Sequence, residues 1–165
     1  MSLISIRRIR VEDISKNLME QLSTVLTYEE PQNFGNCFKW WETWFSHEIP
    51  GDKITIIAEK EDSIVGVVRF WRTPFCNNKW LIEGLEVISP ERKKGIGKSM
   101  VLEGIDMLRN TTNEEIFVHI ANKNTASIKL HESIGFKKVS TGSINSYGYF
   151  RAHVDEYLLE TFAQT

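Results

Sequence analysis

One stretch of the sequence combines glycines and basic residues in the manner of an anion-binding turn. It reads Arg-Lys-Lys-Gly-Ile-Gly-Lys-Ser over residues 92–99. Glycine has no Cβ, so two glycines let backbone N–H groups come close to a ligand. If a helix begins here, its first N–H groups are unpaired and its dipole favours an anion. The stretch therefore predicts a phosphate-binding turn. Its basic residues are Arg92, Lys93, Lys94 and Lys98.

Two familiar phosphate-binding motifs fit this stretch poorly. The P-loop, G-x-x-x-x-G-K-[ST], matches at Gly97-Lys98-Ser99 but requires glycine where Arg92 stands. The dinucleotide motif, G-x-G-x-x-G, matches at Gly95 and Gly97 but has Met100 in place of the third glycine. A nucleotide-hydrolysing protein is therefore a remote alternative.

A predicted strand precedes the turn and a predicted helix follows it. Residues 81–88 are apolar and β-branched, which favours a strand. From residue 96 onward Ile96, Met100, Ile105 and Leu108 recur at helical spacing. The turn is thus placed between a strand and a helix, where an anion would meet the helix N-terminus.

The turn also matches the pattern R-x-x-G-x-G, and in this the chain resembles the GCN5-related N-acetyltransferases (the GNAT superfamily). A second match lies over residues 124–136, which read Asn-Thr-Ala-Ser-Ile-Lys-Leu-His-Glu-Ser-Ile-Gly-Phe. This segment resembles the family pattern N-x-x-[AS]-x-x-L-[YH]-E-x-x-G-F. The two motifs stand in the family's order with a predicted strand between them, and together they cover roughly the second half of the chain.

The resemblance implies an α/β (α+β) fold of the acyl-CoA N-acyltransferase type. Such a fold has a mixed, mostly antiparallel sheet of about seven strands with about four helices. Its fourth and fifth strands run parallel and splay apart, and the pantetheine arm of the cofactor enters there. One N-acetyltransferase domain over residues 1–165 is expected, because a chain of 165 residues suits a single domain.

The resemblance makes acetyl-CoA the expected cofactor. Its pyrophosphate would lie on the backbone N–H groups of residues 92–98. The backbone of Leu85 and Val87 would pair with the pantetheine amides as an added strand does, and an N–H in this stretch would face the thioester oxygen as an oxyanion donor. The expected cofactor-binding residues are Leu85, Val87, Arg92, Lys93, Lys94, Gly95, Ile96, Gly97, Lys98, Asn124 and Ser127.

Acetyl transfer to an amine requires removal of a proton, because a lysine-like amine with a pKa of ~10.4 is protonated at neutral pH. A carboxylate can take that proton directly or through water. Glu83 and Glu86 lie on opposite faces of the predicted strand because side chains alternate. In relatives with a base on this strand the glutamate shares the face of Leu81, which favours Glu83. A bulge would reverse the facing and favour Glu86, and a solvated or ion-paired glutamate is the structural alternative.

Asn124, Ser127 and His131 recur at spacings of three and four residues, so they share one helix face. Many family members have tyrosine at the position of His131, where its hydroxyl acts as general acid near the thioester sulphur. Imidazolium is a good acid for a thiolate whose pKa is ~8.5, so His131 is the candidate acid. It can instead only orient the thiol, or be an ordinary histidine. Asn124 can bind the cofactor, cap the helix, or do both.

The remaining elements follow from periodicity and turn signals. The aromatic stripe over residues 34–47 predicts a helix with Trp41 and Trp44 in the core, whereas Trp40 lies off that face and can line a substrate cleft. Segments expected to face the acceptor are residues 26–45, 72–78 and 142–148. Strands are expected over residues 4–7, 53–60, 64–71, 81–88, 115–121, 137–140 and 147–159, with a turn at 142–146, and helices over 14–26, 34–47, 96–108 and 124–134.

Composition excludes several classes of protein. A net charge of −2 argues against a general nucleic-acid binder, so the basic turn is a local feature. No apolar run approaches the length of a membrane span, and the N-terminus has no signal-peptide core. Two cysteines, Cys37 and Cys76, and four histidines show no metal-binding spacing. A reduced, cytoplasmic setting without membrane or nucleic-acid partners is expected.

The resulting hypothesis is an acetyl-CoA-dependent N-acetyltransferase in which the amine attacks directly through a tetrahedral intermediate. Neither motif contains a cysteine, so no acyl-enzyme is expected. The alternative is a non-catalytic CoA-binding module, which would not need Glu83 or His131. The acceptor is a small-molecule or peptide amine whose identity the sequence leaves open. Glu29 and Glu30 can attract a cationic amine or simply be solvated, and a homodimer is common in the family.

Overall fold

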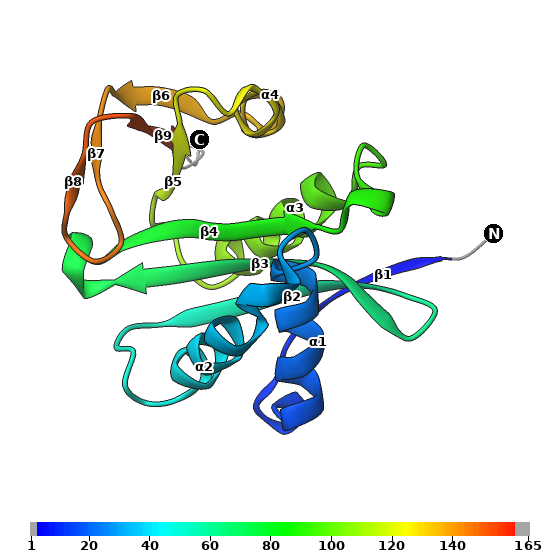
Figure 1. Cartoon of the computed structure of the whole chain (residues 1–165). Coiled ribbons are helices and arrows are strands. Elements are labelled where there is room, and N and C mark those ends of the chain that lie inside the picture. The colour runs from blue at the N-terminus through cyan, green and yellow to red at the C-terminus, as the bar shows by residue number, and fades with distance from the viewer. Residues whose placement is uncertain (1–2, 161–165) are drawn as a thin grey trace. The chain divides into compact units, whose positions relative to one another are not determined.

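The computed structural model of the chain describes residues 3–160. Seven strands form one sheet in the order β1-β2-β3-β4-β5-β9-β6, and β7 and β8 form a separate two-stranded sheet (Figure 1). The predicted sheet of about seven strands, with its parallel fourth and fifth strands, is confirmed. The strands are β1 (Ile4–Arg8), β2 (Lys53–Lys60), β3 (Ser63–Thr73), β4 (Lys79–Val87), β5 (Ile116–Ala121), β6 (Lys137–Ser140), β7 (Ser143–Ile144), β8 (Phe150–Arg151) and β9 (Val154–Leu159). The α-helices are α1 (Lys16–Leu26), α2 (Phe34–Phe45), α3 (Ile96–Arg109) and α4 (Thr125–Ile134).

The chain divides into two compact units, each with its own internal contacts. The first unit comprises Met1–Pro50, Ile54–Arg69 and Gly84–Glu103. The second comprises Gly51–Lys53, Phe70–Glu83 and Gly104–Thr165. The boundary passes through β4 between Glu83 and Gly84, so the predicted base and the anion-binding turn belong to different units. The single N-acetyltransferase domain stays a prediction.

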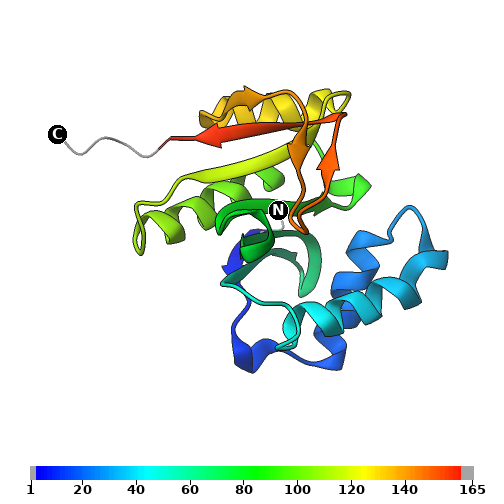
Figure 2. The same ribbon diagram turned by 90° about the vertical axis from the view of Figure 1, so that its left-hand side faces the viewer.

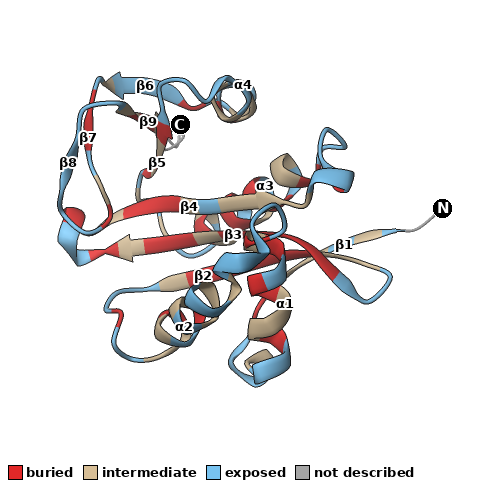
Figure 3. Cartoon of the chain, in the orientation of Figure 1, coloured by how far each residue is buried: buried red, intermediate tan, exposed pale blue. Residues whose placement is uncertain are grey.

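The core of the first unit is built by α1, α2 and the buried middle of β2 (Figure 3). Ser15 begins α1 by accepting a hydrogen bond from the Leu18 N–H at 3.1 Å, which satisfies one of the helix's unpaired donors. Trp41 and Trp44 of α2 are fully buried, so their predicted core role is confirmed. The indole N–H of Trp44 donates to the Thr55 hydroxyl at 2.9 Å, and this bond avoids burying a polar group without a partner.

The second unit contains β5 between β4 and β9. β4 pairs in parallel with β5 over only three residue pairs, of which the last is Ile82 with Val118. β5 then pairs antiparallel with β9 along its whole length, from Ile116 to Ala121. Alternation along β5 buries Ile116, Val118 and Ile120 on one face. The side chains of Phe117 and His119 therefore lie on the opposite face.

The continuous strand predicted over residues 147–159 is wrong. Asn145 accepts hydrogen bonds from the N–H groups of Tyr147 and Tyr149 on its side-chain oxygen, at 3.0 and 2.9 Å, and Gly148 has a left-handed backbone with φ of 92°. These features close a tight turn, so β7 and β8 form a narrow hairpin (Figure 2). β9 begins only after a further turn at residues 152–153. The predicted turn at 142–146 accordingly contains β7.

Within residues 3–160, no helix is both long enough and apolar enough to cross a membrane.

Candidate active site

The predicted anion-binding turn lies directly before α3, in the first unit. Lys93 and Gly95 both adopt a left-handed backbone, with φ of 62° and 82°, so the chain reverses sharply before the helix. Ser99 donates to the Gly95 carbonyl at 3.0 Å and closes the first helical turn. A Cβ on residue 95 would meet no atom within 4 Å. The first N–H groups of a helix have no intrahelical partner, so the start of α3 can bind a diphosphate.

Arg92 contacts two residues at the end of β4. Its Nε donates to the Val87 carbonyl oxygen at 2.8 Å, and its guanidinium lies 3.8 Å from the Glu86 carboxylate. The guanidinium is about half-exposed, so it can still turn donors toward an anion. Arg92 therefore ties the turn to the segment of β4 that the sequence predicts to contact pantetheine.

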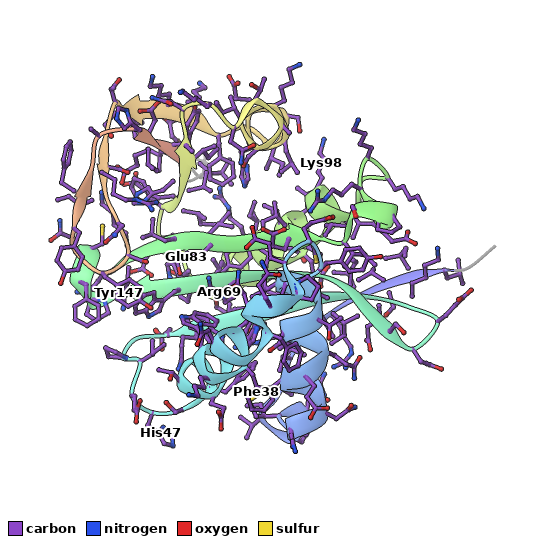
Figure 4. The ribbon with its side chains drawn as sticks, in the orientation of Figure 1. Phe38, His47, Arg69, Glu83, Lys98 and Tyr147 are labelled. Carbon is purple, nitrogen blue, oxygen red and sulfur yellow. The ribbon has the colours of Figure 1, made fainter. Side chains whose placement is uncertain are left out.

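Glu91 forms an ion pair with Lys94, which the sequence predicted to be a charge partner of the pyrophosphate. The Lys94 ammonium pairs with one carboxylate oxygen of Glu91 at 3.0 Å, and Lys60 pairs with the other at 2.7 Å. The hydrogen bonds from Lys60 and Lys94 hold the pKa of Glu91 below its usual range. Lys94 is thus committed to an internal ion pair, whereas Lys98 projects from the first turn of α3 (Figure 4).

Gly84, inside β4, has a left-handed backbone with φ of 60°. A Cβ at this position would lie 2.6 Å from Nη2 of Arg69. A left-handed residue inside a strand breaks the alternation of side chains, as a bulge does. The facing of Glu86 can therefore not be counted from Glu83, and the alternative that a bulge favours Glu86 stays open. Burial raises the pKa of Glu86, and Arg92 opposes that rise.

The guanidinium of Arg69 lies over two tryptophans of α2 (Figure 4). Its Cζ is 4.3 Å from the ring centre of Trp40 and 4.9 Å from that of Trp44. The two indoles are themselves stacked, with centroids 5.7 Å apart. Such cation–π contacts orient a guanidinium firmly. Trp40, which the sequence placed off the core face, is therefore part of a rigid cation–aromatic stack.

Two segments that were predicted to face the acceptor meet in the second unit. Thr73, at the end of β3, donates its hydroxyl hydrogen to the Ser146 carbonyl at 2.6 Å. Phe75 and Tyr147 stack with centroids 6.3 Å apart, and both contact the buried Trp71. The contact unites residues 72–78 with residues 142–148 in one aromatic cluster.

The polar face predicted for α4 is formed. Asn124 is the helix N-cap, and its side-chain oxygen accepts from the Ser127 N–H at 3.2 Å. His131 lies with Nδ1 2.8 Å from the Ser127 carbonyl oxygen and 3.3 Å from the Ser127 hydroxyl. The structure thus brings all three residues together, and the capping role of Asn124 is confirmed.

His131 is almost completely buried, with 1% of its surface exposed. A carbonyl can only accept, so Nδ1 carries the hydrogen and Nε2 keeps a lone pair. Nε2 is buried without a hydrogen-bond partner among residues 3–160. Burial lowers the pKa of the imidazole, against the opposing effect of the Ser127 carbonyl. The ring is therefore neutral and fits a ligand that donates a hydrogen, such as a thiol or an amide.

This buried histidine should make stability depend on pH. Its folded-state pKa lies below the unfolded value of ~6.5, so the unfolded chain binds the proton first as the pH falls. We expect the free energy of unfolding, measured by urea denaturation, to decrease between about pH 7 and pH 5. His131→Gln should reduce that decrease, whereas His153→Gln, at an exposed position, should leave it intact. An equal decrease in all three proteins would contradict the assignment.

One cluster in the second unit was not predicted from the sequence. His119 of β5 contacts Glu156 of β9, with Nε2 2.9 Å from Oε2, and Lys79 of β4 contacts both carboxylate oxygens at 3.2 Å. The Lys79 ammonium also lies 4.5 Å from the ring centre of Phe117. No local motif marks these residues, because only the register of three strands brings them together.

The two thiols are poor nucleophiles. Cys76 is buried and donates to the Ile144 carbonyl at 3.5 Å, while Cys37 is partly buried, and neither forms a disulfide. Burial raises the pKa of both thiols. A protonated thiol reacts slowly, since the thiolate is the reactive form. No group of histidine, cysteine and carboxylate side chains within residues 3–160 could hold a metal ion.

Known proteins resemble this chain in sequence and in fold. Mycothiol acetyltransferase of Renibacterium salmoninarum is 35% identical over 54 residues, which are 33% of this chain and 16% of that protein. The L-amino acid N-acyltransferase MnaT of Escherichia coli is 26% identical over 96 residues, covering 56% of this chain and 55% of its own. This chain thus spans about half or less of the length of these relatives. The PaiA N-acetyltransferase of Thermoplasma acidophilum, solved in complex with coenzyme A, matches with a TM-score of 0.66 and 16% identity over 97% of this chain and 99% of that one.

A family model also matches this chain over most of its length. The model described as the acetyltransferase (GNAT) family matches residues 12–136, which include both motifs of the sequence analysis and most of the described elements. The chain belongs to the acetyltransferase (GNAT) family.

Proposed function

We propose that this protein is an N-acetyltransferase that transfers the acetyl group of acetyl-CoA to a primary amine. The observation that carries the proposal is the turn before α3, where Lys93 and Gly95 reverse the backbone directly ahead of the helix N-terminus. Family membership supports acetyl-CoA as the ligand of that turn. When bound, acetyl-CoA supplies an acetyl group activated as a thioester.

The residues that would hold the cofactor are those of the turn, the end of β4 and the first turns of α4. The backbone of residues 92–98 would bind the pyrophosphate, with Lys98 and Arg92 as its charge partners. Lys94 would act indirectly, since it already pairs with Glu91. The backbone of Leu85 and Val87 would bind the pantetheine amides, and Asn124 and Ser127 stay predicted contacts of the cofactor.

His131 would orient the thiol of CoA and would not act as its general acid. Its Nδ1 hydrogen is committed to the Ser127 carbonyl, and its Nε2 has a free lone pair. A lone pair accepts a hydrogen bond, so Nε2 would accept from the thiol of the product or from an amide N–H of the ligand. Orienting the thiol is one of the three alternatives that the sequence left open for His131, beside a general acid and an ordinary histidine.

Glu83 would meet the protonated amine. It is the last residue of β4 before Gly84, and it follows directly after the paired Ile82. A carboxylate there attracts an ammonium group and can take a proton from it, directly or through water. The amine would attack the thioester directly, because the raised thiol pKa of Cys37 and Cys76 makes an acyl-enzyme on either residue unfavourable.

The acceptor would be a small-molecule or peptide amine. Partial likeness to an L-amino acid N-acyltransferase makes amino acids the first class to test. The free thiols support a reduced, cytoplasmic setting, and the net charge of −2 offers little attraction to nucleic acid. A homodimer would be in keeping with the family.

The proposal is tested by an amine screen that follows release of CoA. The purified protein is incubated with acetyl-CoA and, separately, with amino acids, an aminoglycoside, a polyamine and a peptide with a free N-terminus. We expect release of CoA that depends on one class of amine and on the protein. A melting temperature raised by acetyl-CoA, together with no turnover on any amine, would instead indicate a non-catalytic CoA-binding module.

A further inference from the structure

The second unit contains a carboxylate–imidazole pair on the sheet face that also bears Glu83. Leu81 of β4 pairs in register with Phe117 of β5, so these two side chains share a face. Two residues further along each strand stand Glu83 and His119, which alternation returns to that same face. They are the first positions beyond the last paired residues, Ile82 and Val118.

His119 is held in one tautomer by its neighbour on β9. Glu156 is the direct cross-strand partner of His119, and its Oε2 lies 2.9 Å from Nε2. The hydrogen bond from His119, assisted by Lys79, holds the pKa of Glu156 below its usual range, so the carboxylate is ionised and accepts. Nε2 therefore carries the hydrogen, and the lone pair lies on Nδ1.

The imidazole of His119 is largely buried, and one of its ring nitrogens has no hydrogen-bond partner within residues 3–160. The side chain of His119 is 9% exposed, and that of Glu156 is 12% exposed. Nδ1 of His119 forms no hydrogen bond within residues 3–160, although it is not among the fully buried, unsatisfied atoms. A ring nitrogen with an oriented lone pair beside a strand-borne carboxylate is the arrangement of a general base.

We infer that His119, oriented by Glu156, is the base that takes the proton from the acceptor amine. The inference rests on the proposed N-acetyltransferase function. The sequence predicted that Glu83 takes the proton of the amine, whereas here two residues act on the amine. Glu83 attracts and holds the ammonium group, and His119 removes its proton. Lys79 keeps Glu156 ionised through its two 3.2 Å contacts, and Glu156 is a positioning residue because it acts only through the imidazole.

Nδ1 of His119 accepts one proton from R–NH3+, which leaves R–NH2 and an imidazolium stabilised by Glu156. The nitrogen lone pair then forms the C–N bond to the acetyl carbon, and the C–S bond breaks. The second amine proton passes to the departing sulphur, which yields the amide and the thiol of CoA. His119 returns its proton to solvent before the next cycle.

The charged groups that face His119 are Glu156 from β9 and Lys79 and Glu83 from β4. The hydrogen bond from His119 and the charge of Lys79 hold the pKa of Glu156 below its usual range, so the carboxylate stays an acceptor toward the ring. The measurable consequence is a pH dependence of catalysis.

The test compares the pH profile of kcat/KM for the wild type and for His119→Gln, with the best acceptor amine of the screen. With His119 as base, wild-type kcat/KM should stay nearly constant over several pH units below the amine's own pKa. In His119→Gln, whose side-chain amide can still donate to Glu156, only the neutral amine reacts. Its kcat/KM should be about 100-fold lower at pH 7 and should rise about tenfold per pH unit up to pH 9.

Three further measurements separate chemistry from structure. His153→Gln, at an exposed histidine, is the matched control and should keep the wild-type profile. The melting shift with acetyl-CoA should be the same in His119→Gln as in the wild type, since the residue does not bind the cofactor. In the free protein, 15N NMR of the ring should show the Nε2–H tautomer of His119, and Glu156→Gln should lose that preference.

The outcomes are distinct. A wild-type protein that acetylates no amine overturns the proposed function and this inference with it. An active wild type whose profile is unchanged by His119→Gln overturns the inference alone and returns the base to Glu83. An Nδ1–H tautomer in the free protein would also overturn it, because Nδ1 would then have no lone pair to accept a proton.

Discussion

Glu83→Gln is expected to lower kcat/KM for amine acetylation by about 100-fold. The substitution keeps the size of the side chain but removes the charge that would hold the ammonium group. A hydrogen bond to a charged group contributes about 1.5–3 kcal/mol, and each 1.36 kcal/mol is tenfold in rate. Initial rates of CoA release at subsaturating amine measure this effect. The melting shift with acetyl-CoA should be unchanged, because Glu83 does not contact the cofactor in the proposed arrangement.

Glu86→Gln is the matched control, since it removes a carboxylate from the same strand on the other side of Gly84. Glu86 lies 3.8 Å from Arg92, so its loss should alter cofactor binding more than the reaction of the amine. If Glu86→Gln reduced kcat/KM far more than Glu83→Gln, with cofactor binding intact, the bulge alternative would hold and Glu86 would be the residue that meets the amine.

Gly104→Ala is expected to destabilise the protein by about 2–3 kcal/mol. A Cβ at position 104 of α3 would lie 2.1 Å from Cε2 and 2.3 Å from Cζ of Phe70, whose ring is fully buried. The ring has no space into which it can move, because interiors are close-packed. Overpacking therefore outweighs the gain of about 1 kcal/mol that alanine normally brings over glycine in a helix. Urea denaturation at constant pH measures the difference.

Gly35→Ala provides the opposite case. Gly35 lies in α2, and a Cβ there would meet no atom within 4 Å. The same substitution should thus leave stability unchanged or raise it by up to about 1 kcal/mol. If Gly104→Ala proved as harmless as Gly35→Ala, the close approach of α3 to Phe70 would be contradicted.

The sequence predicted those features that depend on local signals. The turn at Gly95 and the cap at Asn124 are set by residues adjacent to them, and both were found where they were expected. The hairpin of β2 and β3 likewise follows from a short polar turn, in which Glu61 and Asp62 both have positive φ, as two-residue hairpin turns require. The buried face of α2 follows from the spacing of its tryptophans.

The features that the sequence could not settle depend on contacts between distant residues. Gly84 takes its left-handed conformation with Arg69 lying against it, 15 residues earlier in the chain, so the facing of Glu86 could not be counted from alternation. The β7–β8 hairpin depends on one side chain, that of Asn145, which accepts two backbone N–H groups. The sequence of residues 147–159 reads as one strand because it lacks a proline and is rich in aromatic residues.

The neighbourhoods of two histidines also follow from tertiary structure alone. His119 and Glu156 are 37 residues apart and meet only because β5 and β9 pair in one register. His131 was predicted on a polar helix face, yet it is buried and its ring is neutral. Burial changes its expected chemistry from proton donor to hydrogen-bond acceptor, and the periodicity of α4 carries no sign of that change.

The most direct test of acetyl transfer by this protein follows the label of [14C]acetyl-CoA in a single turnover with the best amine of the screen. We predict that all transferred label appears as N-acetylated amine and that none is bound to the protein at any time before completion. Label bound covalently to the protein during turnover would contradict direct attack by the amine. Label that stays in acetyl-CoA with every amine, although acetyl-CoA raises the melting temperature, would contradict catalysis and leave a CoA-binding module.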